Sequence, residues 1–558
     1  MNLEVMKIED RKILTCTTDE GILYQLSSRY FPDKYQKIWA RKHLSKNLYA
    51  KYHVFGLGDG SYLRELLKIA DSSSSFIVYE PKKEILDYIY SEFELNDILK
   101  DKRVTIISEE MNDSLSSYFC GKLSITDISG SVTCVYPNYP SIFRKEYDFF
   151  TAALAKAVHI TVYSAATVAH QHQFLLENTL VNMRALSSSY NITALRKIIS
   201  PDMPILIAGA GPSLTAAMPF IRQYRDKIVI MAVDSAIPSL LKHDIIPHFF
   251  ISVDPAKEER NFEDPRVACI PCIIPILARA CICKNRKAPT FFYKSGSNFY
   301  KFLNNFTTQS FQTIDAESSV SNHAFGIAMY LKSKNVLLTG VDLAFLDGKA
   351  HSEGALLEDL IIEDSKKLYT VTGVNGETLY TDHQMDLYRK LLEDRIKLSK
   401  DMNVINTSET GAYIRHTVQM SMKDALEKYC KNNIGLKFDK LTPIDFNYRE
   451  AMETLIDRQS SLYNSLTRMI DKVKAYDIQT TYEEAMPIIL QLDSLVTYVL
   501  QSPEMELVHI RTMKDCLSSI LSIREKGIVK EHIARYIAYL EQVAINCKIQ
   551  IDIEKELI

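Results

Sequence analysis

The stretch ILIAGAGPSLTAAMPFI, residues 205–221, decides how the middle of the chain folds. Its first four residues, Ile205–Ala208, are apolar and predict a buried strand, and the apolar spacing further on predicts a helix. Between them, Gly209 and Gly211 allow a tight turn, and Pro212 fits the first helical position, where no N–H donor is needed. Such a turn presents backbone amides and a helix dipole to an anion. It therefore predicts a phosphate-binding loop.

This glycine loop is not a Walker loop. A GxxxxGK[ST] motif would place a lysine against the phosphates of a nucleotide, and no lysine follows here. Ser213 supplies a hydroxyl instead. A larger side chain at Gly211 is expected to clash with the path of the phosphate.

Strands and helices continue to alternate beyond the loop. Apolar runs at 228–233, 248–253 and 336–340 predict further strands, which favours a mostly parallel, doubly wound sheet. Ligands of such sheets bind beyond the carboxyl ends of the strands. Polar residues follow three of these ends, namely Asp234, Ser235, Ser252, Asp254 and Asp342, and a Ser-rich segment with Ser318 and Ser319 begins a helix. Helix caps and turns explain each residue alone, but the set together predicts a site.

A second glycine loop occurs near the N-terminus. Residues 52–81 read as a strand, a GLGDG turn, a helix and a strand that ends at Glu80, which is one βαβ unit. The glycines could bring amides close to a ligand, and the acid could bind a ribose. Many GxGxG turns are packing devices only, so the sequence leaves the function of this loop open.

The chain is predicted to be a multidomain α/β protein of 558 residues. We expect a Rossmann-like domain at 1–150, connecting helices at 151–200, a central doubly wound domain at 201–435 and a helical domain at 436–558. The 66 basic and 69 acidic residues are mixed along the chain, which argues against a nucleic-acid partner. The charged N-terminus is unlike a signal peptide and no spanning segment is apparent, so we expect a cytoplasmic protein without a membrane span.

Ten cysteines fit reduced thiols better than disulfides. Cys269, Cys272, Cys281 and Cys283 have a spacing that could bind zinc. The apolar IIPILARA between the two pairs lacks the turn residues of a zinc knuckle, so we expect buried strand cysteines and no metal site.

Several of these motifs together resemble one family. The central segments that carry the resemblance are GAGPSL, AVDSA, SVDP, SSVSNHAFGIA and LLTGVDLAF, the last followed by GKAH. Upstream, GLGDGSYL, VYEP and FLLENTLVN extend it. These segments resemble the motility-associated factor (Maf) glycosyltransferases, which modify flagellin, over nearly the whole chain. The central motifs are also similar to bacterial sialyltransferases, which implies a sialyltransferase-like (GT-A-like) central fold.

The resemblance implies a reaction and a donor site. A nonulosonic acid of the pseudaminic or legionaminic type would be transferred from a CMP-activated donor to serine or threonine of flagellin. The transfer would invert the configuration at the anomeric carbon and would require neither a metal nor a cofactor. Flagellar assembly and motility would depend on this modification. The loop residues Gly209, Gly211, Pro212 and Ser213 would meet the donor phosphate. The nucleotide would be lined by Asp234, Ser235, Ser252 and Asp254 and closed by Ser318, Ser319, Gly340 and Asp342.

The acceptor hydroxyl needs a general base, and histidine has a suitable pKa. The catalytic candidates are His351, Asp342 and His383. His351 is the first of them, with Lys349 as a phosphate partner, although a surface position is the alternative for either histidine. Sialyltransferases carry tyrosines near the phosphate where this chain has Ala344 and Phe345, and their histidine aligns only within a residue or two of His383. The base is therefore left open.

Two other functions compete with this one. Archaeal pterin-type pyrophosphokinases share a similar GxGPSL domain and use a nucleoside triphosphate, but this function leaves two further domains unexplained. A non-enzymatic flagellin-binding protein would keep the loops only as parts of a fold. The oligomeric state is left open.

Overall fold

The computed structural model describes residues 2–8, 11–26, 31–284, 286–314, 319–346, 351–355, 368–475 and 481–558. The chain forms two compact units. Unit 1 contains Met1–His170, Ser460–Leu500 and Val508–Ile551, and unit 2 contains Gln171–Gln459, Gln501–Leu507 and Asp552–Ile558. Segments of the C-terminal part thus belong to both units. The predicted domain boundaries at 150, 200 and 435 divide the chain differently and stay predictions.

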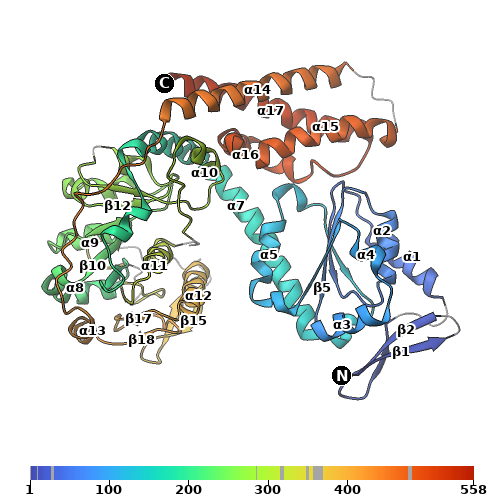
Figure 1. The fold of residues 1–558 in the computed structure, drawn as a ribbon, viewed down its shortest axis with the longest axis horizontal. Helices are drawn as coiled ribbons and strands as arrows, with labels where there is room; N and C mark the ends of the chain where they lie inside the picture. Colours follow the sequence, from blue (N-terminus) through green and yellow to red (C-terminus); the bar gives the residue numbers. More distant parts are fainter. Residues whose placement is uncertain are drawn as a thin grey trace. The chain divides into compact units, whose positions relative to one another are not determined.

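Unit 1 is built on a parallel sheet in the order β6-β5-β4-β7. The predicted βαβ unit is confirmed by β4 (Lys51–Phe55), α2 (Ser61–Ile69) and β5 (Ser75–Glu80). Figure 1 shows α1 and α2 on one side of this sheet and α5 on the other. The remaining elements of this part are β1 (Asn2–Ile8), β2 (Arg11–Thr17), β3 (Leu23–Gln25), α1 (Pro32–His43), α3 (Lys83–Glu92), α4 (Asn96–Leu99), β6 (Val104–Ser108), α5 (Leu115–Lys122), β7 (Ser131–Val135) and α6 (Tyr139–Ile142).

A single helix of 42 residues, α7 (Arg144–Ala185), follows the sheet of unit 1. Phe150 and Leu154 near its start pack in the core of unit 1. Met183 near its end is fully buried and belongs to unit 2. Within the described residues, the segment 144–188 is long and apolar enough to cross a membrane, by length and composition only. The sequence predicted connecting helices at 151–200, but no membrane-spanning segment.

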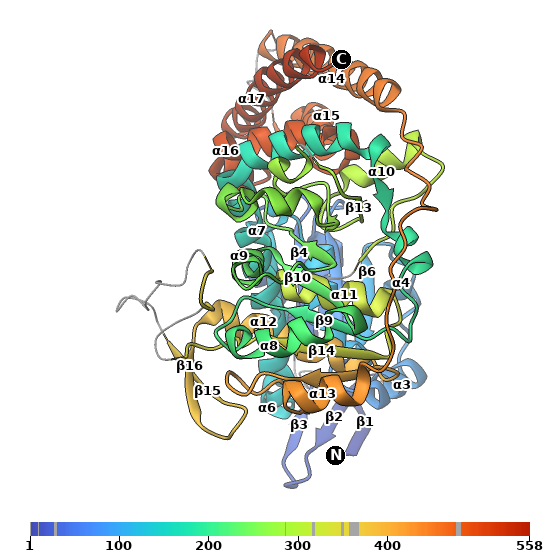
Figure 2. The same cartoon turned by 90° about the vertical axis from the view of Figure 1, so that its left-hand side faces the viewer.

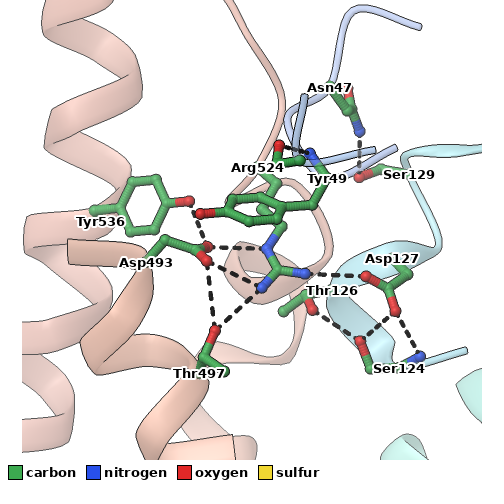
Figure 3. Close-up of polar contacts among 11 residues, drawn as sticks. Asn47, Tyr49, Ser124, Thr126, Asp127, Ser129, Asp493, Thr497, Arg524 and Tyr536 are labelled. Carbon is green, nitrogen blue, oxygen red and sulfur yellow. Dashed lines mark hydrogen bonds and ion pairs between the residues drawn. The ribbon is translucent and has the colours of Figure 1, made fainter. Parts of the chain in front are cut away.

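The C-terminal part consists of long helices, as predicted. They are α14 (Tyr448–Lys474), α15 (Tyr482–Gln501), α16 (Glu506–Leu521) and α17 (Val529–Glu556). Within unit 1, Arg524, between α16 and α17, joins these helices to the sheet part: its guanidinium contacts Asp493 of α15 at 2.9 Å and Asp127 at 3.0 Å (Figure 3). We call these three residues the Arg524 cluster.

His53 in the middle of β4 is completely buried, and neither ring nitrogen has a hydrogen-bond partner among the described residues. Burial, with a smaller effect from the charge of Lys51, lowers the pKa of His53 to about 4. Because the ring is protonated more easily in the unfolded chain, its contribution to stability is intact above pH 6.5 and is lost as the pH falls toward 4.

We therefore expect a fall in pH to lower the free energy of unfolding of the wild type more than that of the His53→Leu variant. Between pH 7.5 and pH 5.5 the wild type should lose about 1 kcal/mol more free energy of unfolding than the variant. Urea unfolding at both pH values measures this difference. His170→Gln, an exposed histidine on α7, should respond to pH as the wild type does, and equal losses in wild type and His53→Leu would contradict the prediction.

Unit 2 contains the predicted parallel sheet, in the order β18-β17-β14-β9-β10-β11-β12-β13-β8, with every neighbouring pair parallel. Figure 2 shows β10, β9 and β14 beside one another in this order. The strands are β8 (Tyr190–Asn191), β9 (Ile205–Ala208), β10 (Val229–Val233), β11 (Phe249–Ile251), β12 (Cys272–Ile274), β13 (Thr290–Phe292), β14 (Asn335–Thr339), β17 (Asn403–Asn406) and β18 (Val418–Gln419). The four strands predicted from the sequence correspond to β9, β10, β11 and β14.

Helices of unit 2 pack against this sheet. The side chains of α11 share a core with Ile205 and Ile207 of β9 and with Val229 and Met231 of β10. The helices are α8 (Ser213–Tyr224), α9 (Ile237–Lys242), α10 (Phe299–Leu303), α11 (Val320–Tyr330), α12 (His383–Leu398) and α13 (Met422–Tyr429), and β15 (Tyr369–Thr372) pairs with β16 (Thr378–Thr381).

The order of the strands creates a switch point in this sheet. From β9 the chain adds β10 to β13 in one direction and then returns to the other side of β9 for β14 and β17. Open α/β sheets bind ligands beyond the carboxyl ends of their strands at such a switch point, which here lies at the ends of β9 and β14. The glycine loop quoted first follows β9 at this switch point.

Candidate functional site at the sheet switch point

The glycine loop after β9 is in backbone contact with the end of β14. Gly209 N–H donates to Thr339 O at 2.8 Å, and Gly211 N–H donates to Gly340 O at 2.7 Å. A Cβ atom on Gly209 would overlap the carbonyl oxygen of Gly340, and one on Gly340, whose φ is +64°, would overlap the carbonyl oxygen of Gly209. These two glycines therefore allow two strand ends to approach closely.

Asp342, just beyond β14, caps the helix that follows the glycine loop. Its completely enclosed carboxylate accepts hydrogen bonds from Ser213 N–H at 2.8 Å and from Ser213 Oγ at 2.5 Å. Burial raises the pKa of Asp342 to about 6, and the hydrogen bonds from Ser213 and Ser408 limit the rise. The anion at the start of α8 is thus a carboxylate of the protein.

This arrangement corrects one expectation. A Cβ atom on Gly211 would lie 2.5 Å from Asp342 Oδ2, so a larger side chain there collides with the protein itself rather than with the path of a phosphate. Three amides of the predicted phosphate loop, those of Gly209, Gly211 and Ser213, also donate to protein acceptors. The assignment of Gly209, Gly211, Pro212 and Ser213 to the donor phosphate stays a prediction.

A second polar cluster follows β10 and β11. Asp234 is completely buried and accepts hydrogen bonds from Ser252 Oγ at 2.7 Å and from Ser235 N–H at 2.7 Å. Lys257 completes it, with Nζ 2.9 Å from Asp234 Oδ1. The strand ends singled out in the sequence are therefore in contact with one another. Asp254 closes a turn by accepting from Ala256 N–H at 2.8 Å, which agrees with the turn expected as the alternative to a site role.

His351 lies against the glycine loop. Its half-buried imidazole hydrogen-bonds the backbone of Ala210, and Ser352 N–H donates to Ala210 O at 2.8 Å. Burial lowers the pKa of His351, the positive charge of Lys257 lowers it further, and the bond to Ala210 opposes both effects. The lowered pKa favours the neutral imidazole, which can accept a proton.

Two further predicted site residues lie at the starts of helices. Ser319 caps α11 by accepting from Asn322 N–H at 3.1 Å, and His383 is exposed at the first position of α12. Ala344 and Phe345 are buried in the protein. Ser318 and Lys349 lie outside the described residues.

Lys257 and Ser408 are the site residues that sequence reasoning missed. Lys257 follows SVDP by two residues, and the turn made by Asp254 directs it back toward β10. Ser408, two residues beyond β17, is hydrogen-bonded to Ser213, with 2.9 Å between their Oγ atoms. A lysine soon after an Asp-Pro turn was a signal in the sequence, whereas the contact of Ser408 depends on the strand order.

A cavity of about 440 Å³ lies at the opposite edge of the sheet, before β10, β11 and β12, and is lined among others by Arg225, His248 and Cys269. It contains none of the predicted site residues. We place the candidate site at the switch point because the polar strand ends meet there.

The cysteines differ partly from the expectation. Cys272 is a buried strand residue in β12, as predicted, but Cys269 is exposed, and Cys281 and Cys283 lie in a short 3-10 helix. The strand ends at Ile274 because Pro275 cannot donate to the sheet. Within the described parts of the chain, no group of three or more His, Cys, Asp or Glu side chains is placed to hold a metal ion.

Tyrosine side chains of unit 1 pack against the glycines of the GLGDG loop. A Cβ atom on Gly56 would overlap the ring of Tyr139, and one on Gly58 would overlap that of Tyr136. Leu57 N–H donates to Glu80 Oε2 at 2.9 Å, and burial raises the pKa of this acid to about 8. The acid predicted to bind a ribose instead binds the loop, so the structure supports the packing alternative.

Comparison with known proteins first finds a similarity in the central part of the chain. The family model of 6-hydroxymethylpterin diphosphokinase MptE-like proteins matches residues 177–348, which include the glycine loop and β9 to β14. Two uncharacterized proteins of Treponema pallidum (strain Nichols) also match. One is 33% identical over 93 residues, covering 15% of this chain and 40% of the relative, and the other is 26% identical over 182 residues, covering 31% of each. The chain thus spans less than half the length of these curated relatives.

A solved structure then extends the likeness to nearly the whole chain. The Maf glycosyltransferase from Magnetospirillum magneticum AMB-1 matches with a TM-score of 0.61 and 15% identity, over 97% of this chain and 91% of that chain. The protein has the fold of that Maf glycosyltransferase. The resemblance seen in the sequence is confirmed at the level of the fold.

Proposed function

We propose that the protein is a glycosyltransferase that moves a nonulosonic acid of the pseudaminic or legionaminic type from a CMP-activated donor to serine or threonine of flagellin. The observation that carries this proposal is the gathering of polar side chains at the strand ends beside the glycine loop, against which His351 lies. The fold shared with a Maf glycosyltransferase supports the same function. A cytoplasmic location and a role in flagellar assembly belong to the proposal.

The chemistry needs a base and a place for the leaving group. His351 takes the proton of the acceptor hydroxyl on the ring nitrogen that does not bind Ala210. The acceptor oxygen forms a bond to the anomeric carbon, and the bond from that carbon to the phosphate oxygen breaks. The electron pair leaves with CMP, whose developing negative charge requires a donor or a cation at the sheet edge.

The proposal predicts a mass increase of flagellin. Purified protein, incubated with a CMP-nonulosonic acid and flagellin, should add the mass of the sugar to serine or threonine residues. His351→Gln should lower the turnover by about 10² to 10⁴-fold, the range for loss of a general base. His170→Gln changes an exposed side chain on α7 and should leave the turnover unchanged. Intact-protein mass spectrometry measures all three rates.

Two results would point elsewhere. If His383→Gln abolishes transfer while His351→Gln does not, His383 is the base. If instead the protein consumes ATP with Mg²⁺ and a hydroxymethylpterin, the pyrophosphokinase named in the family-model description replaces the proposal. Flagellin binding without either reaction would favour a non-enzymatic protein.

A further inference from the structure

Lys257 places a positive charge at the ends of β10 and β11. Its Nζ atom lies 2.9 Å from Asp234 Oδ1 and 2.5 Å from Ser235 Oγ. Its side chain is 17% exposed, whereas Asp234 is completely buried, so the lysine is held from the protein side while its side chain keeps some contact with the surface. The ion pair and the hydrogen bond therefore hold the ammonium group in one position.

The carboxylate that holds Lys257 is itself rigid. Asp234 Oδ2 accepts from Ser252 Oγ, and Oδ1 also accepts from Ser235 N–H. A side chain whose rotamer is fixed by such partners can present a charge to a ligand without further ordering.

A phosphate bound at the glycine loop would need a positive charge from outside the loop. The amides of Gly209, Gly211 and Ser213 donate to protein acceptors, and Asp342 adds a carboxylate at the start of α8. A phosphate bound at the switch point would meet fewer free donors than the sequence motif suggests. A cation beside it would offset this loss, because hydrogen bonds between ionised partners are about twice as strong as neutral ones.

Lys257 lies at the same edge of the sheet as that loop. In the parallel pairing of β9 and β10, Ala232 is opposite Ala208, so Asp234, which holds Lys257, comes level with Ala210 in the loop. Ser352 N–H donates to Ala210 O at 2.8 Å, which places His351 next to the same loop. The cation, the candidate base and the glycine loop therefore lie at the carboxyl edge of the sheet.

We propose that Lys257 binds the phosphate group of the nucleotide donor and that Asp234 positions its ammonium group for this contact. This inference rests on the proposed function. A phosphate oxygen takes the place of Ser235 Oγ in the coordination of Nζ, while the ion pair with Asp234 stays in place. Lys257 also separates the negative charge of the leaving phosphate from the buried charge of Asp234.

The test compares CMP with cytidine, which lacks the phosphate. Calorimetry on the full chain should show that Lys257→Met lowers the affinity for CMP by about 10 to 100-fold, the usual effect of one hydrogen bond to a charged group. The affinity for cytidine should stay unchanged. Lys242→Met is the matched control, because Lys242 pairs with Glu353 in the same unit and is 52% exposed. It should bind both ligands as the wild type does.

A second variant guards against loss of folding. The double variant Asp234→Asn/Lys257→Met buries no unpaired charge, and it should lose the preference for CMP over cytidine to the same extent. Equal losses for CMP and cytidine, or no loss of either, would overturn the assignment of Lys257 and leave the proposed function intact. If the wild type binds ATP with Mg²⁺ instead of CMP, the donor is wrong, and ATP and adenosine then test Lys257 in the same way. Absence of any nucleotide binding by the wild type would overturn both proposals.

Discussion

Alanine in place of Gly340 should lower the free energy of unfolding of unit 2 by about 3 kcal/mol. The left-handed backbone of Gly340, with φ at +64°, costs a residue with a side chain about 1 to 2 kcal/mol. The new Cβ atom would also overlap the carbonyl oxygen of Gly209 and lie 3.0 Å from Leu214 Cβ. Overpacking of this kind adds about 1 to 3 kcal/mol. Guanidinium unfolding followed by circular dichroism measures the loss.

Gly296 offers a matched control in the same unit. Its φ is +69°, and nothing lies within 4 Å of a Cβ atom built on it. Gly296→Ala should therefore cost only the backbone strain, about 1 to 2 kcal/mol. The difference between the two variants isolates the contact between the ends of β9 and β14. Equal costs would show that this contact is not a source of stability.

The same contact explains why the glycine motif alone is ambiguous. A loop that carries Gly-Ala-Gly-Pro-Ser suits a phosphate, but it also suits a close neighbouring strand, and both uses require the absence of Cβ atoms. In unit 1 the GLGDG turn packs against tyrosine rings. In unit 2 the GAGPS turn packs against the end of β14 and against Asp342. A ligand at the switch point then depends on side chains outside the motif, such as Lys257.

The strands were predictable from the sequence, and their order in space was less so. Apolar runs between glycine and polar residues were enough to predict β9, β10, β11 and β14, because buried parallel strands are nearly continuous in apolar residues. The parallel sheet followed from the alternation with helices. The convergence of Asp234, Ser235 and Ser252 followed from their place at strand ends.

Contacts between distant segments were not predictable from local pattern. Asp342 lies 129 residues from Ser213, and only the return of the chain to the other side of β9 brings them together. The distribution of the C-terminal helices over two units depends in the same way on side chains far apart in the sequence. Asp127 and Arg524 are 397 residues apart, and neither lies in a recognisable motif.

The Arg524 cluster is the strongest case of such a contact within unit 1. Two carboxylates from distant segments share one guanidinium, and Tyr536 OH donates to Asp493 at 2.8 Å (Figure 3). Tyr49 lies over the guanidinium, whose Cζ is 4.6 Å from the centre of its ring. Arg524 is 8% exposed, so removal of its charge would leave two buried carboxylates without their cation.

Arg524→Met should therefore destabilise unit 1 by about 3 to 5 kcal/mol, the cost of breaking a buried ion pair from one side. Lys526→Met is the control: Lys526 pairs with Asp71 at 3.2 Å in the same connection, but it is 33% exposed, and such a pair contributes about 1 kcal/mol or less. Denaturant unfolding gives the free energies. Hydrogen exchange of residues 115–135 and 482–500 should speed up in Arg524→Met, because the cluster joins these segments. Equal effects of the two variants would mean that the helices are held to the sheet part by apolar packing instead.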